Sequence, residues 1–292
     1  PRVGFADGKT VAEGIKGQKG ARNSPTTLNS AFYDLQFWDG RAETLEEQAK
    51  GPFINPVEMG MPSHDALVKK LRAIPEYAEL FQKVFRTKAF TIDHIVQAIA
   101  SFERTLVTFN SPFDRFIAGD TKAISASARR GWDLFNGKAR CNTCHGFVQS
   151  LPFFTDNKFH NIGVGAKHAN FDELARRAEK EKDIALLAHE KEASELGRFL
   201  VTKKRGEIGA FKTSSLRDIA LTAPYMHDGS EPTLESVIEF YNKGGEPNPY
   251  LDGGIRPLDL TKSEVEDLVE FLKTLTSDDS AKMQKEFAED VK

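Results

Sequence analysis

Residues 140–146 read RCNTCHG, and they hold the only two cysteines of the 292-residue chain. A disulfide between Cys141 and Cys144 would close a very small loop and add little stability. A structural zinc site needs further soft ligands, and the sequence has no second cysteine pair. A redox dithiol of the thioredoxin kind usually follows a strand, whereas residues 125–140, just upstream, are typical of a helix.

The spacing C-x-x-C-H is the attachment signature of c-type haem. Two thioether links one helical turn apart suit the two vinyl groups of a porphyrin, and His145 follows at once as the proximal iron ligand. We therefore interpret Cys141, Cys144 and His145 as a covalent haem site, with Trp132 upstream as core packing. Haem of this kind is attached outside the cytoplasm, so we expect a periplasmic protein that does not depend on disulfides.

The composition narrows the class of protein further. Hydrophobic residues make up 39% of the chain, which is enough for proper cores, and the net charge of −3 gives no reason to expect nucleic acid. No apolar run reaches the ~20 residues of a membrane span. The first residues, PRVGFADGKT, include neither a start methionine nor a signal peptide, so we expect them to come from the interior of a longer protein.

Apolar residues recur at helical spacing in several segments, and alternation typical of strands is scarce. Ile92, Ile95 and Ile99 form one stripe behind a candidate cap at Thr91. Residues 261–264, TKSE, have the form of a capping box, and Thr233 could begin a helix that carries Tyr241 on its buried face. The pattern predicts a mainly α fold with little β.

Three other segments stand out. Residues 1–62 are rich in Gly, Pro and Asn but carry aromatics, so they predict a long irregular segment with a function. Residues 111–128 are a plausible domain boundary. Residues 167–207 are dense in Lys, Glu and Arg, and we expect a solvated helical insertion there, with a partner-docking surface as the alternative.

The order of several motifs resembles the bacterial di-haem cytochrome c peroxidases and their relative MauG. The likeness covers nearly the whole chain apart from the charged insertion. The motifs that carry it are QKGARNSPTT (18–27), QFWDGRA (36–42), LEEQAKGP (45–52), NPVEMG (55–60), CNTCH (141–145), FKTSSLRDIALTAPYMHDGS (211–230) and LDLTKSEVEDLVEFLKTLT (258–276).

The resemblance implies two cytochrome c-like helical haem domains joined by long irregular loops. Residues 1–125 would belong to the peroxidatic haem domain, and residues 126–292 would form the electron-transfer domain with its haem at 141–145. The family carries two c-type haems, and the first attachment motif would lie upstream of this sequence. A natural one-haem descendant is the alternative.

By resemblance, the distal side of the peroxidatic haem is formed by three residues. Glu58 matches the distal glutamate that moves a proton between the peroxide oxygens, a task suited to a carboxylate. Gln48 matches the glutamine that orients peroxide or water, and Pro52 would restrict access above the iron. Taken alone, Glu58 and Gln48 would be surface residues, and Pro52 a turn proline.

The resemblance also assigns residues between the two haems. Trp38 would help to carry electrons or holes, although a lone tryptophan is more often core packing. Arg41 could pair with a haem propionate, since a guanidinium matches a carboxylate. A calcium ion would take the Asn23 side chain and the backbone carbonyls of Thr222 and Pro224, together with waters.

The sequence differs from the peroxidases at the residue expected to be the sixth ligand of the second haem. The peroxidases place a Met 17 residues after the T-A-P proline, and MauG places a Tyr there; in this chain that position is Tyr241. An anionic oxygen ligand favours ferric iron and lowers the potential, whereas Met raises it. A core tyrosine is the alternative for Tyr241, and Met226 is the rival ligand. His227 is expected to form hydrogen bonds or to gate access rather than to bind iron.

The sequence also differs from the family pattern in the loop before Q-K-G. Many members of the family block the peroxidatic haem at rest with a histidine from this loop, but here no histidine precedes His64. We expect an open haem at rest that needs no reductive activation. Electron paramagnetic resonance of the fully oxidised protein should show high-spin ferric iron, and an all-low-spin spectrum would refute the prediction.

Three functions follow from these features. The first is a peroxidase that reduces hydrogen peroxide with electrons from a small cytochrome c or cupredoxin. The second is a MauG-like enzyme that uses peroxide to oxidise side chains of a partner protein, which Tyr241 favours. The third, a one-haem electron carrier, leaves Glu58 and Gln48 unexplained. We adopt the first. The resemblance also implies calcium as a cofactor, and members of the family are often homodimers, which the sequence does not test.

Overall fold

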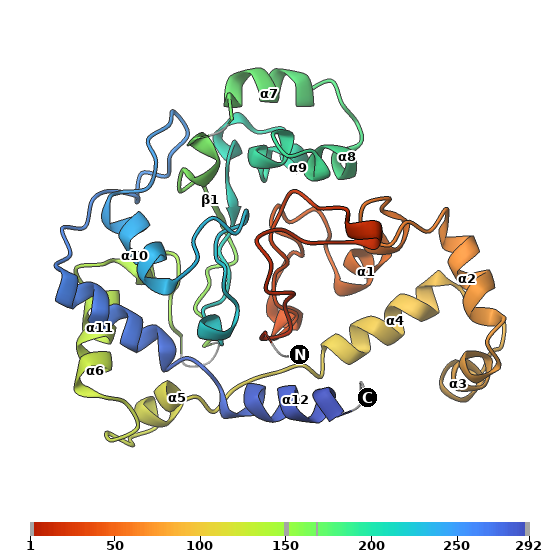
Figure 1. The fold of residues 1–292 in the computed structure, drawn as a ribbon, viewed down its shortest axis with the longest axis horizontal. Coiled ribbons are helices and arrows are strands. Elements are labelled where there is room, and N and C mark those ends of the chain that lie inside the picture. The colour runs from red at the N-terminus through yellow and green to blue at the C-terminus, as the bar shows by residue number, and fades with distance from the viewer. Residues whose placement is uncertain (1–2, 149–151, 168, 290–292) are drawn as a thin grey trace.

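The structure is a computed structural model that describes residues 3–148, 152–167 and 169–289. Most regular elements are helices (Figure 1). The α-helices are α1 (Leu45–Ile54), α2 (His64–Arg72), α3 (Pro75–Phe85), α4 (Ile92–Glu103), α5 (Pro112–Ile117), α6 (Ala126–Asn136), α7 (Phe171–Ala178), α8 (Ile184–His189), α9 (Phe199–Thr202), α10 (Leu234–Asn242), α11 (Lys262–Lys273) and α12 (Asp278–Glu289). Short 3-10 helices lie at Ile15–Gly17, Ser30–Phe32, Cys141–Thr143, Val164–Lys167, Ala193–Leu196, Arg205–Glu207 and Ile219–Leu221.

The sheet structure of the described residues is minimal. β1 (Phe159–His160) pairs antiparallel with β2 (Phe211–Lys212), and these are the two strands of a single small sheet. The expectation of a mainly α fold with little β is therefore confirmed. The irregular segment expected over residues 1–62 is found only in part: residues 3–44 contain short 3-10 helices, turns, bends and isolated β-bridges, whereas α1 occupies Leu45–Ile54.

The C-terminal half is built on the crossing of α6 and α11, at the left of Figure 1. The two backbones approach so closely at Gly131 that a Cβ there would lie 2.0 Å from the carbonyl oxygen of Asp267. Phe135 and Phe271 are almost fully buried beside this crossing, and Trp132 stacks on Phe135 with ring centroids 5.8 Å apart. Trp132 is thus core packing, as expected.

The N-terminal half packs α1 against α4, with α2 and α3 beyond them. Its small core contains the buried side chains Val68, Phe81, Phe90 and Ile95. The C-terminal helix α12 runs beneath both halves (Figure 1), and Phe287 lies edge-on to Phe102 of α4 with ring centroids 5.6 Å apart. The division at residues 125 and 126 stays a prediction.

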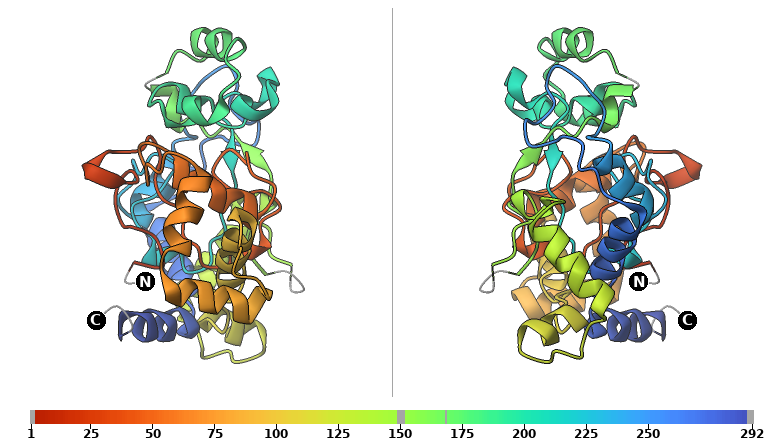
Figure 2. Two further views of the ribbon diagram at one scale, coloured as in Figure 1. Left: turned by 90° about the vertical axis from the view of Figure 1, so that its right-hand side faces the viewer. Right: turned by 90° about the vertical axis from the view of Figure 1, so that its left-hand side faces the viewer.

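The charged segment 167–207 is more than a solvated insertion. It forms helices, as expected, but α7, α8 and α9 enclose a hydrophobic core of their own, and they cap one end of the molecule (Figures 1 and 2). Leu196, Phe199 and Leu200 have no exposed surface. This core was not expected from the sequence, because the apolar residues of the segment are outnumbered by Lys, Glu and Arg, most of which are exposed.

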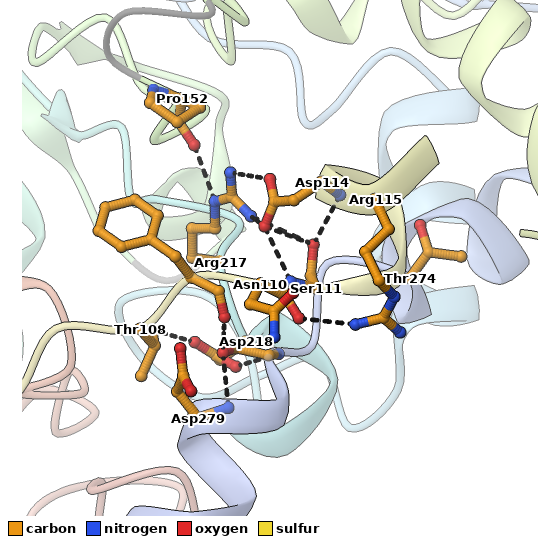
Figure 3. A network of polar contacts seen from close by, with 12 residues as sticks. Thr108, Asn110, Ser111, Asp114, Arg115, Pro152, Arg217, Asp218, Thr274 and Asp279 are labelled. Carbon is orange, nitrogen blue, oxygen red and sulfur yellow. Dashed lines mark hydrogen bonds and ion pairs between the residues drawn. The ribbon is translucent and has the colours of Figure 1, made fainter. Parts of the chain in front are cut away.

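A buried polar network joins the two halves (Figure 3). Arg217, whose side chain has no exposed surface, pairs with both carboxylate oxygens of Asp114 at 2.7 Å. Beside it, Asp218 accepts hydrogen bonds from Thr108 Oγ1 at 2.5 Å and from the backbone N–H of Ser277 at 2.8 Å. The network thus ties the segment after α4 to the segment before α12.

We expect Arg217→Ala to lower the free energy of unfolding by about 3 kcal/mol, because it leaves a half-buried carboxylate without its partner. Burial alone would raise the pKa of Asp114, but the hydrogen bonds from Arg217 hold it below its usual value. This stabilisation is therefore present above the unfolded pKa of about 4 and is lost on acidification below it.

Chemical denaturation at pH 7 and at pH 3 checks this expectation. Lys262→Ala is the matched control, because Lys262 pairs with Glu266 at 4.0 Å while 93% of its side chain is exposed. An exposed pair of this kind contributes roughly 0–1 kcal/mol. Equal losses for the two variants would show that the Arg217 pair adds nothing beyond surface electrostatics.

Candidate active site

A largely apolar cavity of about 390 Å³ lies beside the cysteine pair. Its wall includes Cys141, Cys144, His145 and, from α10, Tyr241. Cofactor and ligand sites usually measure about 300–1,000 Å³ and are lined mainly by apolar side chains. The cavity therefore has the size and lining of a cofactor pocket, and it brings together the residues expected to hold the second haem.

The cysteines lie on a tight turn just after α6. Arg140 has a left-handed backbone with φ of 55°, and the N–H of His145 donates to the carbonyl of Cys141 at 2.8 Å. Both thiols are free, so the disulfide alternative is not observed. Burial raises the pKa of Cys141 to about 12, and a thiol that stays protonated is a poor redox nucleophile.

The zinc alternative is not assembled either. Within the described residues, ligand atoms of Cys144, Asp156 and His160 lie within 4.8 Å of one another, and Cys141 is not part of this group. The two ring nitrogens of His160 already contact Asp156 at 3.0 Å and Asp252 at 2.7 Å. The group is a hydrogen-bonded cluster at the cavity wall rather than a site built on the cysteine pair.

The ring of His145 is held in one orientation. Its Nδ1 lies 2.9 Å from the carbonyl oxygen of Phe154, so Nε2 is the nitrogen left for a bond to a metal. Burial lowers the pKa of His145, which favours the neutral form that ligates metals. A fixed imidazole and two free thiols on the wall of one apolar cavity fit a covalently attached porphyrin.

Both candidates for the sixth ligand border this cavity. Tyr241 comes from the last turn of α10, and its hydroxyl makes no hydrogen bond with the described residues. Burial raises the pKa of Tyr241 well above its usual range. Met226 lies on the same wall, in a left-handed backbone with φ of 70°. The cavity thus admits either residue, and the choice between them stays a prediction.

The three residues proposed for calcium also lie along the cavity. Asn23 is 8% exposed, and its Nδ2 donates to the carbonyl of Lys9 at 2.8 Å, which leaves Oδ1 as the free end of the amide. No donor from the described residues reaches Asn23 Oδ1 or the carbonyl oxygens of Thr222 and Pro224. Oxygens without donors suit a hard cation such as Ca²⁺.

Trp38 borders the same cavity, and both its indole ring and its backbone make hydrogen bonds. Its Nε1 donates to the carbonyl of Asn23 at 2.9 Å, and its carbonyl accepts from the N–H of Lys212 at 2.9 Å. The ring of His227 lies edge-on to it with centroids 6.5 Å apart. Trp38 therefore borders the cavity and is hydrogen-bonded to Asn23, one of the calcium candidates, and its role in carrying electrons stays a prediction.

His227 forms the hydrogen bond that the sequence led us to expect. It is 4% exposed, its Nε2 lies 2.7 Å from Glu195 Oε2, and its ring stacks on Phe211 with centroids 3.6 Å apart. Glu195 belongs to the charged insertion, and its role could not be foreseen from spacing, because 32 residues separate the pair.

Arg41 has a partner within the chain. Its Nη1 lies 3.0 Å from both oxygens of Asp39, which has no exposed surface and also accepts from Arg22 Nη1 at 2.7 Å. The Arg41 guanidinium also lies 3.5 Å from the ring centroid of Phe37. Pairing of Arg41 with a haem propionate stays a prediction. Because Nη1 of the guanidinium is bonded to Asp39, the propionate would have to bind its other N–H groups.

Gln48 and Pro52 lie on one face of α1, four residues apart. Pro52 is inside the helix, so the turn-proline alternative is wrong. Because proline has no N–H, the carbonyl of Gln48 loses its usual helical partner. The side chain of Gln48 and the ring of Pro52 are both half-buried on this face.

Glu58 follows α1 on a turn that folds back onto the end of the helix. The N–H of Met59 donates to the carbonyl of Pro52 at 3.2 Å, and the N–H of Ile15 donates to the carbonyl of Glu58 at 2.8 Å. The Glu58 side chain is 27% exposed. Burial raises its pKa, and the nearby Arg41 opposes the rise. A partly buried carboxyl with a raised pKa can hold and return a proton.

Sequence matches identify the chain as one of the c-type haem oxidoreductases. A family model described as "Di-haem cytochrome c peroxidase" matches residues 1–122. The methylamine utilization protein MauG of Methylorubrum extorquens is 40% identical over 96% of this chain and 72% of its own length. The cytochrome c551 peroxidase of Nitrosomonas europaea is 37% identical over 94% of this chain and 72% of its own length.

The fold agrees with these matches. The crystal structure of a MauG-like protein associated with microbial copper homeostasis aligns with a TM-score of 0.76 at 32% identity, over 96% of this chain and 82% of that chain. The chain belongs to the family of di-haem cytochrome c peroxidases that includes MauG. Within its described part, none of the helices combines the length and apolar character needed to cross a bilayer.

Proposed function

We propose that the chain carries out peroxide reduction in a di-haem peroxidase of the periplasm. The observation that carries the proposal is the apolar cavity whose wall holds Cys141, Cys144 and His145 together with Trp38. A second observation supports it: Glu58, on the turn after α1, is partly buried, and burial raises its pKa.

Reduction of hydrogen peroxide to two waters consumes two electrons and two protons. The haems, when bound, supply the iron chemistry that cleaves the oxygen–oxygen bond and stores electrons. The residues of this chain transfer the proton and orient the peroxide. Glu58 takes a proton from one peroxide oxygen and returns it to the other, a transfer that a positioned carboxyl performs at short range. Gln48 orients the peroxide from the neighbouring face of α1.

Electrons would enter at the haem held by Cys141, Cys144 and His145 and would pass by Trp38 to the peroxidatic haem, beside which Glu58 transfers the proton. The two hydrogen bonds of Trp38 hold its ring in place, and calcium at Asn23, Thr222 and Pro224 would stiffen the same region. The donor would be a small cytochrome c or a cupredoxin. Steady-state turnover of peroxide with a reduced small cytochrome c tests the proposal, and haem content together with mass tests for two haems in the native protein.

A second function is favoured by one observation, the position of Tyr241 on the wall of the cavity that holds His145. If Tyr241 rather than Met226 binds the second iron, this centre would store oxidising equivalents and would accept electrons poorly. The enzyme would then resemble MauG in oxidising side chains of a partner protein. Slow turnover with every small donor, together with oxidation of a partner, would favour this function over the peroxidase.

A further inference from the structure

The charged insertion contacts the site through three side chains. Arg198 Nη1 donates to the carbonyl of Gly40 at 2.8 Å, and Glu195 pairs with His227 at 2.7 Å. The third is His189, the last residue of α8, whose Nε2 lies 2.5 Å from Asn55 Nδ2. Asn55 is the C-cap of α1 and begins the turn that carries Glu58.

The direction of the bond between Asn55 and His189 follows from a second contact. Asn55 Oδ1 accepts from the N–H of Val57 at 2.9 Å, so the amide presents its NH₂ group to the imidazole. A donor facing His189 Nε2 requires a lone pair on that nitrogen. The imidazole is therefore neutral while this bond holds, and its proton is on Nδ1.

The surroundings of His189 favour the same protonation state. Burial and the cationic Arg41 and Arg22 lower the pKa of His189 to about 4, against a smaller opposing effect of Asp39. Glu58 Oε1 is the other charged group that faces the ring, 3.9 Å from Nε2. At neutral pH the imidazole thus contacts the Glu58 turn as a neutral group and leaves the carboxyl unpaired.

The turn that carries Glu58 is contacted by two separate segments of the chain. In the first segment, Gln18 Nε2 donates to the carbonyl of Pro56 at 3.1 Å, and the N–H of Ile15 donates to the carbonyl of Glu58 at 2.8 Å. In the second segment the contact is His189, which comes from an element more than 100 residues away in the chain.

We propose that His189 is a positioning residue of the peroxide site: by accepting the hydrogen bond from Asn55, it fixes the Glu58 turn and keeps solvent from the Glu58 carboxyl. The inference rests on the proposed function, in which Glu58 moves the proton. It gives the charged insertion a role, because the helix that ends at His189 then completes the wall of the peroxide pocket.

The test compares two variants of the full-length protein with both haems bound. His189→Ala removes the acceptor, and we expect kcat/KM for peroxide to fall roughly 10–100-fold as the Glu58 turn moves. The Glu58 carboxyl should become more hydrated, so its pKa should fall towards its ordinary value. His189→Gln should restore both values, because its amide oxygen can accept the hydrogen bond from Asn55.

Infrared titration supplies a measurement that does not depend on activity. The band of the protonated carboxyl is assigned to Glu58 by its loss in Glu58→Gln, and its midpoint is then compared among the variants. Asp183→Ala is the matched control, because it removes the N-cap of α8, whose side chain accepts from Leu186 at 3.0 Å, and leaves His189 unchanged. We expect this control to keep the wild-type midpoint.

The outcomes separate the two proposals. A wild-type midpoint in His189→Ala, an equal shift in Asp183→Ala, or no restoration in His189→Gln would each overturn the positioning role. Full turnover in Glu58→Gln would instead overturn the proposed function itself. Loss of turnover in Glu58→Gln together with normal behaviour of His189→Ala would remove only the role of His189.

Discussion

Glu58→Ala is expected to lower peroxide turnover by roughly 10²–10⁴-fold, the usual contribution of a positioned acid–base group. The carboxyl is partly buried on a turn held by backbone hydrogen bonds, and burial raises its pKa. Both features suit a group that must accept and return a proton near neutral pH. Steady-state kinetics over pH 4–9, with both haems bound, measures the loss.

The acid limb of the rate profile identifies the carboxyl more directly than the size of the loss. In the wild-type protein, kcat/KM should fall on acidification through the raised pKa of Glu58, above the ordinary value of about 4.3. Glu58→Gln keeps the volume but cannot titrate, so the low residual rate should lose this limb. An unchanged limb in Glu58→Gln would assign it to another group.

Glu103 provides a matched control for this experiment. It is another partly buried glutamate of the N-terminal half, and burial raises its pKa while Arg104 opposes the rise. It ends α4, away from the turn at residues 55–60. Glu103→Ala should keep near-normal turnover. A similar loss in both variants would show that any desolvated carboxyl in this half affects the enzyme indirectly.

Local sequence signals predicted much of the helical framework. Thr233 and Thr261 cap α10 and α11 in capping boxes, and α4 begins directly after Thr91. The C-x-x-C-H spacing located the cavity, because two cysteines and a histidine on one turn necessarily share a wall. These predictions succeeded because each depends on residues only a few positions apart.

The parts of the site that were missed depend on contacts between distant segments. His189 reaches Asn55 across 134 positions, and Arg22 reaches the carbonyl of Ser194 across 172. Neither partner has a local pattern that indicates the contact, and the dense charge of the insertion pointed towards solvent. The pairing of Asp39 with Arg41 was also missed, although the two residues lie only two positions apart in QFWDGRA, because the resemblance assigned Arg41 to a haem propionate.

Tyr241→Met is expected to raise the potential of the haem at residues 141–145 by on the order of 0.1 V or more, because a thioether favours ferrous iron whereas a phenolate favours ferric iron. Tyr241 lines the cavity of His145, and its hydroxyl makes no hydrogen bond with the described residues. A phenol oxygen that borders the cavity and makes no hydrogen bond with these residues can serve as an iron ligand. Redox titration followed by absorbance measures the change.

Met226→Leu completes the experiment, because Met226 lines the same cavity and is the rival ligand. If Tyr241 binds iron, Met226→Leu should leave the spectrum and the potential unchanged, whereas Tyr241→Phe should alter both. If Met226 binds iron, the pattern reverses, and the tyrosine is a packing residue of α10. The reversed pattern would leave the peroxidase proposal in place, but it would remove the one observation that favours oxidation of a partner protein.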